Sequence, residues 1–147
     1  AVYVYTAYGA FATKIRLFFR HLDSEIKPDE VYHFYVAMKA ATNKTNRFNK
    51  ELLVYHGVPV KSIKKSGENE IYSGPTSCSK SLIMASDFAT NQGKCDGIII
   101  AIQISSEVLF VDADYISPFY EQEVIVFDCP IKQIMGYYKL EHREHLE

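Results

Sequence analysis

The run from Gly97 to Ile104 constrains the fold of this chain more than any other stretch. Its sequence, GIIIAIQI, places apolar residues on both faces of an extended strand. A strand that is apolar on both faces is covered on both sides, so we expect this one at the centre of a sheet. Shorter runs of β-branched and aromatic residues predict further strands, at Leu52–Tyr55, Glu70–Tyr72, Val108–Val111, Val124–Phe127 and Ile131–Leu140.

The first forty residues have the periodicity of helices. After a lead-in from Ala1 to Gly9, which we expect to be short and extended or irregular, apolar residues recur at helical spacing from Phe11 to Leu22. A second helix begins near Pro28, and its apolar stripe comprises Val31, Phe34, Tyr35, Met38 and Ala41. Because the helices come first and the strands second, the order predicts an α+β fold with helices on one side of an antiparallel or mixed sheet.

Polar and turn-forming residues mark the connections between the strands. Lys61–Asn69 is polar and partly basic and predicts a loop, and Gly74–Ser79 is rich in hydroxyls and predicts a turn. A third helix is expected at Ser81–Thr90, and a loop at Asp112–Tyr120. The apolar side of the third helix comprises Leu82, Ala85, Phe88 and Ala89.

The composition is that of a single globular domain. The chain has 147 residues, of which 48% are hydrophobic, and its formal net charge is -2. These values predict one domain over residues 1–147 and favour neither a nucleic-acid partner nor a membrane partner. No apolar run approaches the roughly 20 residues of a membrane helix. Because the chain begins at Ala1 and not at Met, removal of an upstream segment and secretion both stay open.

Three cysteines, Cys78, Cys95 and Cys129, have spacings that match no zinc site. The simplest interpretation is three reduced thiols, with one disulfide plus one free thiol as the alternative. We expect no metal cofactor.

Three polar motifs interrupt the apolar runs, and each has an ordinary interpretation. His56 suits a structural hydrogen bond, Ser77 and Ser79 suit a turn and a helix N-cap, and Glu121 and Glu123 suit solvated residues. The functional interpretation starts from the glutamates. If the strand predicted at Val124–Phe127 extends back to Glu121, the two carboxylates share one face. Like charges that close raise the pKa of at least one carboxyl, which marks a candidate acid/base or cation-stabilising site.

Taken in order, the motifs resemble those of the mono-ADP-ribosyltransferase family. Its toxin-like branch has an aromatic-Arg-Gly strand end, then Ser-Thr-Ser, then Glu/Gln-x-Glu. Two positions depart from this branch: Cys78 replaces the middle Thr, and His56 replaces the Arg. A His there is similar to the diphtheria-toxin and poly(ADP-ribose) polymerase branch, in which it holds NAD. The matching segments cover most of the chain and comprise Lys14–Arg16, Leu53–Val58, Ser77–Ser79, Ile98–Ile104 and Ile116–Val124.

The resemblance implies an ADP-ribosyltransferase-like α+β fold, in which N-terminal helices pack on a two-sheet, mixed or antiparallel β core. It also implies an enzyme that uses NAD as a substrate, needs no metal and breaks the bond between nicotinamide and ribose. Glu123 would stabilise the positive charge that develops on the ribose, as carboxylates do in glycoside chemistry, and Ser77 would orient Glu123 or the ribose. The implied NAD-binding residues are Arg16, His56, Gly57, Ser77 and Ser79.

The resemblance further predicts the acceptor. Glu at the first position of the last motif goes with arginine acceptors in the family, and a carboxylate can orient a guanidinium through two parallel hydrogen bonds. Glu121 is therefore a third catalytic candidate, and Phe119 and Tyr120 would meet the target protein or else pack under the loop. The alternatives are an NAD glycohydrolase, an inactive binding module of the same fold, and an α+β domain with chance motifs. A secreted or host-delivered effector or toxin is favoured, with a cytoplasmic enzyme as the alternative.

Overall fold

The computed structural model describes residues 2–19, 28–40, 42, 52–66, 74–105, 108–119, 121–129 and 134–141. The helices within these ranges are α1 (Val2–Ala7), α2 (Gly9–Phe19), α3 (Pro28–Lys39), α5 (Val60–Ser66), α7 (Leu82–Ala89) and the 3-10 turn η1 (Ala113–Tyr115). The strands are β1 (Leu52–Pro59), β2 (Pro75–Ser79), β3 (Gly97–Ile104), β4 (Leu109–Asp112), β5 (Glu123–Phe127) and β6 (Ile134–Leu140). Helices and an antiparallel sheet together make an α+β fold, as expected.

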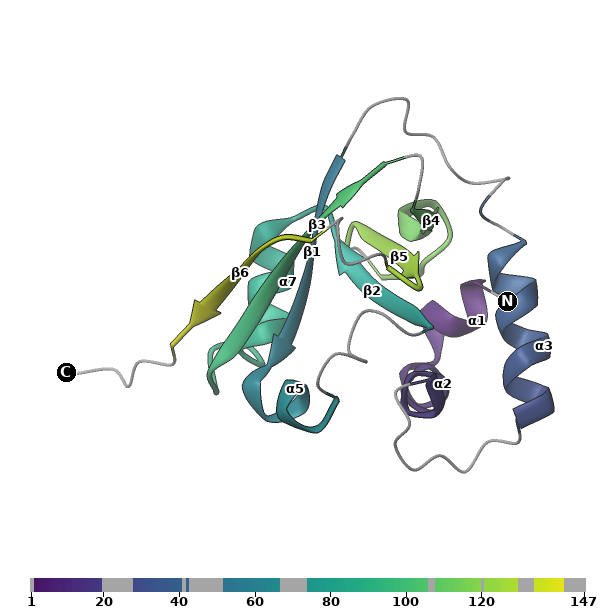
Figure 1. Cartoon of the computed structure of the whole chain (residues 1–147), viewed down its shortest axis with the longest axis horizontal. Coiled ribbons are helices and arrows are strands. Elements are labelled where there is room, and N and C mark those ends of the chain that lie inside the picture. The colour runs from purple at the N-terminus through teal and green to yellow at the C-terminus, as the bar shows by residue number, and fades with distance from the viewer. Residues whose placement is uncertain are drawn as a thin grey trace.

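The described strands form one sheet in the order β4-β5-β2-β1-β3-β6, with every neighbouring pair antiparallel (Figure 1). β3 lies between β1 and β6, which confirms the prediction of an interior strand. β3 pairs with β1 along its whole length. β1 and β2, in contrast, are in register at one position, where Tyr55 lies opposite Ser79.

The expected two-sheet core is therefore wrong as stated, because the described strands belong to one sheet. That sheet nevertheless has two halves, β4-β5-β2 and β1-β3-β6, which join where Tyr55 meets Ser79. Figure 1 shows the two strands diverging from this position, β1 toward α5 and β2 toward α2. The two halves of the sheet are thus joined at a single pair of opposed residues, one on β1 and one on β2.

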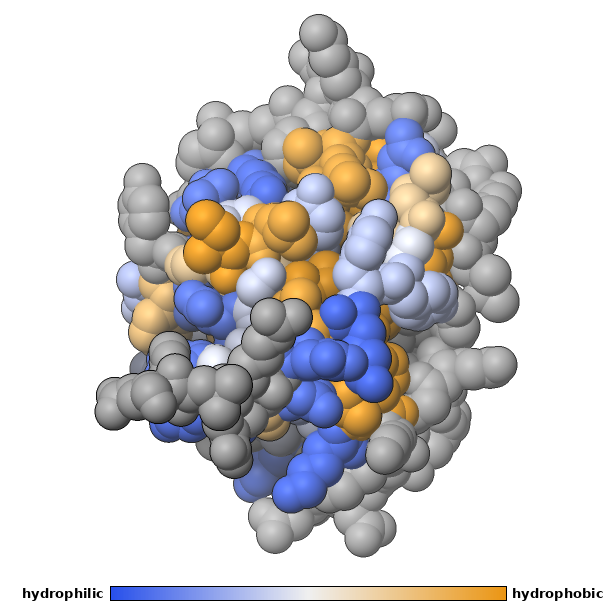
Figure 2. Space-filling model, turned by 90° about the vertical axis from the view of Figure 1, so that its left-hand side faces the viewer, coloured by the Kyte–Doolittle hydropathy of each residue, from blue (hydrophilic) through white to orange (hydrophobic). Residues whose placement is uncertain are grey.

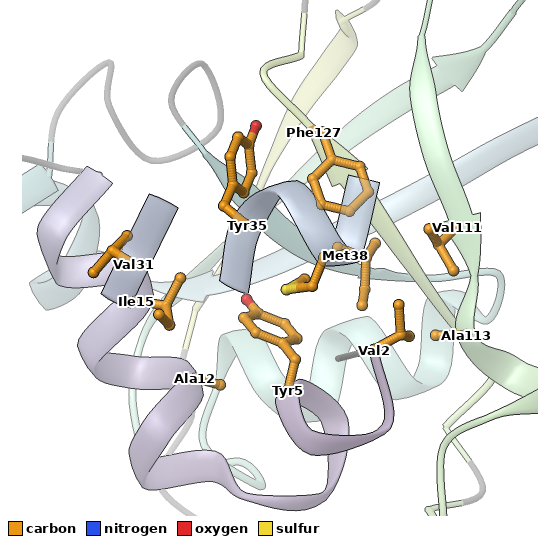
Figure 3. Packing of buried hydrophobic residues seen from close by; sticks show 11 residues of the cluster. Val2, Tyr5, Ala12, Ile15, Val31, Tyr35, Met38, Val111, Ala113 and Phe127 are labelled. Atoms are coloured by element: carbon orange, nitrogen blue, oxygen red, sulfur yellow. The ribbon is translucent and has the colours of Figure 1, made fainter. Parts of the chain in front are cut away.

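The N-terminal helices pack on the β4-β5 side of the sheet, as the order of the elements predicts. Figure 3 shows side chains of α1, α2 and α3 gathered in one cluster with Phe127 of β5 and Val111 of β4. The stripe predicted for the second helix is confirmed at Val31, Tyr35 and Met38, which are all buried. These helices cover one face of the sheet.

Helix α7 lies against β1 and β3, and glycines allow it to approach closely. A Cβ added at Gly57 would lie 1.9 Å from the carbonyl oxygen of Ala85, and one added at Gly97 would lie 2.1 Å from another carbonyl oxygen of the helix. The helix therefore contacts the sheet through a narrow stripe of small residues. The prediction that Leu82 and Phe88 belong to the buried side of this helix is wrong, because both side chains are half exposed.

Two segments are helical where the sequence indicated otherwise. Residues 2–7 form α1 instead of an extended lead-in, because Val2 and Tyr5 lie three residues apart and both enter the cluster of the N-terminal helices. Residues 60–66 form α5 instead of a loop, and Ile63 packs against a buried cluster that includes Val54 and Ile100. In both cases burial in the tertiary structure decides the conformation.

Two further segments are strands. Residues 75–79 form β2 instead of a turn, because β5 supplies a partner opposite each residue. β1 does not end before His56 but continues through Gly57, since β3 pairs with it throughout. The N-cap of α7 is Ser81, whose hydroxyl accepts a hydrogen bond from a backbone N–H of the first turn, and not Ser79.

Cys78, Cys95 and Cys129 are free thiols, as the simplest interpretation predicted. None of the described helices is both long enough and apolar enough to cross a membrane. Figure 2 shows the side of the molecule that carries β6, where apolar and polar residues mix at the surface. The predictions for residues 20–27, 41, 43–50, 67–73, 120 and 131–133 fall outside the described residues.

Candidate active site

β2 and β5 bring Ser77 and Glu123 to one face of the sheet. In their antiparallel register, Ser79 lies opposite Glu123 and Ser77 lies opposite Ile125. Opposed residues of neighbouring strands point to the same face, and so do residues two apart on one strand. The shared face is the one that the N-terminal helices cover, because Ile125 belongs to their cluster. The Ser77 hydroxyl donates a hydrogen bond to the Glu123 carboxylate.

Glu123 is buried, and its surroundings change its acidity. The residue is 8% exposed. Burial raises the pKa of Glu123 from its ordinary value of 4.5 to about 7, and the charge of Glu121 adds to the rise. The hydrogen bond from Ser77 and the charge of Arg16 act in the opposite direction. The carboxyl therefore gains and loses its proton near neutral pH, as acid/base groups of active sites do.

Glu121 lies near Glu123, but not through the strand geometry that the sequence predicted. β5 begins at Glu123, and the preceding residue, Gln122, has a φ of 50°, which lies in the left-handed region. The chain turns between the two carboxylates, so the expectation that they share one face of a strand is wrong. Their charges still interact. Glu121 is partly buried, and burial raises its pKa.

The turn before β5 is fixed by the residues that follow β2. The Ser79 hydroxyl donates to the carbonyl oxygen of Glu121 at 2.8 Å and accepts from the backbone N–H of Ser81 at 3.0 Å. The backbone N–H of Lys80 donates to the carbonyl oxygen of Gln122 at 3.0 Å. A hydroxyl has one hydrogen to donate, and that of Ser79 is used in the bond to the carbonyl oxygen of Glu121. Ser79 therefore positions Glu121. Its NAD-binding role stays a prediction.

His56 bridges the two halves of the sheet. It is 7% exposed, and its Nδ1 lies 2.9 Å from the carbonyl oxygen of Ser77. Since a carbonyl oxygen can only accept, Nδ1 carries a hydrogen and donates it to Ser77. Ser77 thus binds His56 through its carbonyl and Glu123 through its hydroxyl. The first and last of the predicted motifs meet at this serine.

Arg16 of α2 reaches the same site. Its charge acts on Glu123, and its guanidinium is held by two hydroxyls, with Nη1 3.1 Å from Tyr5 Oη and Nη2 3.3 Å from Thr13 Oγ1. The guanidinium carbon also lies 5.8 Å from the centre of the Tyr5 ring. The predicted cation is therefore close to the predicted carboxylate. Gly57 lies against α7, and a backbone carbonyl of that helix occupies the space that a Cβ would need. Packing against α7 is therefore a sufficient reason for a glycine at this position.

Lys80 anchors the loop before Glu121, a role that was not predicted from the sequence. Lys80 Nζ lies 3.0 Å from both carboxylate oxygens of Asp112, at the end of β4, and 3.7 Å from Asp114. Asp112 is 1% exposed and also accepts from the backbone N–H of Asp114. Lys80 therefore holds both ends of this loop. Its side chain binds Asp112 at the start of the loop, and its backbone N–H binds Gln122 at the end. A lysine directly after the Ser-Cys-Ser motif was the available signal.

The loop itself presents Phe119 to solvent. This side chain is 50% exposed, and its backbone N–H donates to Ser117 Oγ at 3.1 Å. Its exposure suits a contact with a partner better than packing under the loop. Tyr120 lies outside the described residues.

Comparison with known proteins adds no relative to this geometry: no protein-family model matches the chain, and no curated protein sequence is significantly similar to it. Among the described residues, no group of three or more His, Cys, Asp or Glu side chains is placed to hold a metal ion. A buried carboxyl that titrates near neutral pH can stabilise a nearby positive charge when ionised and can accept a proton.

Proposed function

We propose that this chain is an NAD-dependent mono-ADP-ribosyltransferase that transfers ADP-ribose to an arginine side chain and releases nicotinamide. The observation that carries the proposal is the environment of Glu123. This carboxyl is buried, bound by the Ser77 hydroxyl and has a pKa of about 7. A carboxylate kept away from water interacts more strongly with a developing positive charge than a solvated one does.

The reaction needs such a charge-stabilising group. When the bond between nicotinamide and ribose breaks, its electron pair leaves with the neutral nicotinamide, and positive charge develops on the ribose. Glu123 in its ionised form faces that charge, and Ser77 keeps the carboxylate oriented. An arginine nitrogen then bonds to the ribose carbon and gives up a proton. Groups of this kind typically contribute about a hundredfold to a thousandfold in rate.

Arg16 and His56 are assigned different parts of NAD. The Arg16 guanidinium, oriented by Tyr5 and Thr13, offers the planar donor set that binds phosphate oxygens. His56 donates through Nδ1 to the Ser77 carbonyl oxygen, and we assign its ring to the ribose of NAD. Arg16 thereby supplies the charge that the family obtains from Arg at the position of His56.

Glu121 is assigned to the acceptor. Its partly buried carboxyl lies in the turn held by Ser79 and Lys80, next to Glu123. Two carboxylate oxygens match a guanidinium fork, and close approach of that cation favours the ionised carboxylate. Phe119, exposed in the same loop, and Tyr120 would meet the protein that carries the arginine. The family resemblance alone leads us to propose a secreted or host-delivered effector, with a cytoplasmic enzyme as the alternative.

NAD glycohydrolysis is the second candidate. A carboxyl with a pKa of about 7 has the basicity to activate a water molecule at physiological pH. The same residues would cleave NAD, and water would take the place of arginine.

Adenine-labelled NAD and agmatine, a small guanidine, test the proposal. We expect wild-type protein to release nicotinamide and to form ADP-ribosylated agmatine. Glu121→Gln should lower agmatine modification at least tenfold more than it lowers nicotinamide release. Release with only free ADP-ribose as product would support the glycohydrolase instead. Equal losses of both products in Glu121→Gln would assign Glu121 to NAD cleavage.

A further inference from the structure

The first turn of α7 presents apolar side chains to solvent beside the candidate site. Ile83 is 75% exposed and Leu82 is 50% exposed. The helix contacts the sheet through Ala85 and Ala89, so these two larger residues contribute little to the core. Large exposed apolar residues that cluster are a mark of protein-binding surfaces.

The first turn of α7 lies close to the turn that contains Glu121 and Gln122, because a short stretch of chain and one hydrogen bond connect them. The backbone N–H of Lys80 lies 3.0 Å from the carbonyl oxygen of Gln122. Three residues span at most about 11 Å, so Ile83 lies within roughly 15 Å of Gln122. A standard protein interface buries about 800 Å² on each partner, which corresponds to a disc roughly 30 Å across. One partner can therefore cover Glu121 and the first turn of α7 together.

The charges of this surface are acidic. Glu121 is partly buried in the turn, and Asp87 is exposed on α7 one helical turn after Ile83, on the same side of the helix. Lys80, the cation of the connecting segment, has its Nζ 3.0 Å from the buried carboxylate of Asp112. The surface therefore complements a partner segment that is cationic and carries apolar side chains.

We infer that Leu82 and Ile83, with Phe119, form the surface that docks the acceptor protein, and that this surface selects an arginine flanked by apolar side chains. The inference rests on the proposed transfer to arginine. Glu121 orients the guanidinium, while the apolar residues of α7 bind the neighbouring side chains of the acceptor. Aromatic and apolar anchors around a desolvated charge are the usual arrangement of an interface hot spot.

Two peptides of eleven residues test this inference. Each has one central arginine, and they differ at four flanking positions, which are leucine in one peptide and glycine in the other. Five extended residues reach roughly 17 Å from the arginine, which is far enough to contact the first turn of α7. The measured quantity is kcat/KM for ADP-ribosylation of each peptide, divided by the value for agmatine with the same variant.

Ile83→Ser removes an exposed apolar side chain of the surface, and Phe88→Ser removes one from the other end of the same helix. We expect wild-type protein to prefer the leucine peptide about tenfold, which corresponds to about 1.4 kcal/mol. Ile83→Ser should abolish the preference, and Phe88→Ser should retain it. Circular dichroism of both variants checks that each is folded.

The surface is refuted if wild-type protein modifies both peptides equally, if Ile83→Ser keeps the preference, or if Phe88→Ser loses it to the same extent. Modification of agmatine without modification of either peptide also refutes the surface and leaves the proposed function intact. If neither peptide nor agmatine is modified, the transferase function itself is wrong, and the docking surface is rejected with it.

Discussion

Replacement of Glu123 by Gln should make the protein more stable, by an amount that depends on pH. The ordinary pKa of the carboxyl is 4.5, and in the folded protein it is about 7. Between these pH values the folded protein keeps a proton that the unfolded chain has released. The stability associated with protonated Glu123 is therefore fully present below about pH 4.5 and is lost as the pH rises through 7. At 1.36 kcal/mol for each pKa unit, the loss approaches about 3 kcal/mol.

Gln keeps the shape of the side chain and does not titrate. Relative to wild type, Glu123→Gln should gain about 1 kcal/mol in the free energy of unfolding at pH 5 and about 3 kcal/mol at pH 8. For a domain of 147 residues, the gain at pH 8 corresponds to about 10 °C in melting temperature. Thermal melts followed by circular dichroism at the two pH values measure it. Asp87→Asn, which changes an exposed carboxylate on α7, is the control.

A melting-temperature gain that is equal at pH 5 and pH 8 would contradict a raised pKa of Glu123, and so would a loss at pH 8. Either result would mean that the Glu123 carboxyl is solvated in the folded protein. If Asp87→Asn showed the same pH-dependent gain, the cause would be the overall charge and not the burial of one carboxyl.

Three further predictions follow from the contacts of the site. Ser77→Ala removes the hydrogen bond that lowers the pKa of Glu123, so the midpoint of the pH profile of nicotinamide release should move to higher pH. Gly57→Ala places a Cβ against a backbone carbonyl of α7 and should cost about 1–3 kcal/mol in urea unfolding. Lys80→Met leaves the buried carboxylate of Asp112 without its cation and should cost about 3–5 kcal/mol, with Lys80→Arg restoring most of the loss.

The sequence predicted the elements whose periodicity agrees with their burial. β3 is apolar on both faces and is an interior strand, and the stripe of α3 is buried at Val31, Tyr35 and Met38. In contrast, the alternation of Val and Tyr in residues 2–7 resembles a strand, although Val2 and Tyr5 are buried at helical spacing. When a short segment fits both the period of a strand and the period of a helix, its tertiary contacts determine which conformation it adopts.

At the candidate site, the sequence indicated which residues to consider but not how they meet. Gln122 adopts a left-handed conformation, which nothing in a Glu-Gln-Glu sequence signals, and this turn removes Glu121 from the strand. The ion pair of Lys80 with Asp112 joins residues far apart in the chain, so the position of Lys80 after the Ser-Cys-Ser motif does not reveal its partner. The burial that sets the pKa of Glu123 depends on the covering helices, which sequence alone does not position.

The most direct test of the account is nicotinamide release from NAD at pH 8, measured for wild type and for Glu123→Gln. At this pH Glu123 is ionised in the folded protein, because its pKa is about 7. We predict release by the wild type and a loss of about a hundredfold or more in Glu123→Gln, although that variant melts at the higher temperature. Equal turnover by the two proteins, or no release by the wild type, would contradict the role assigned to Glu123.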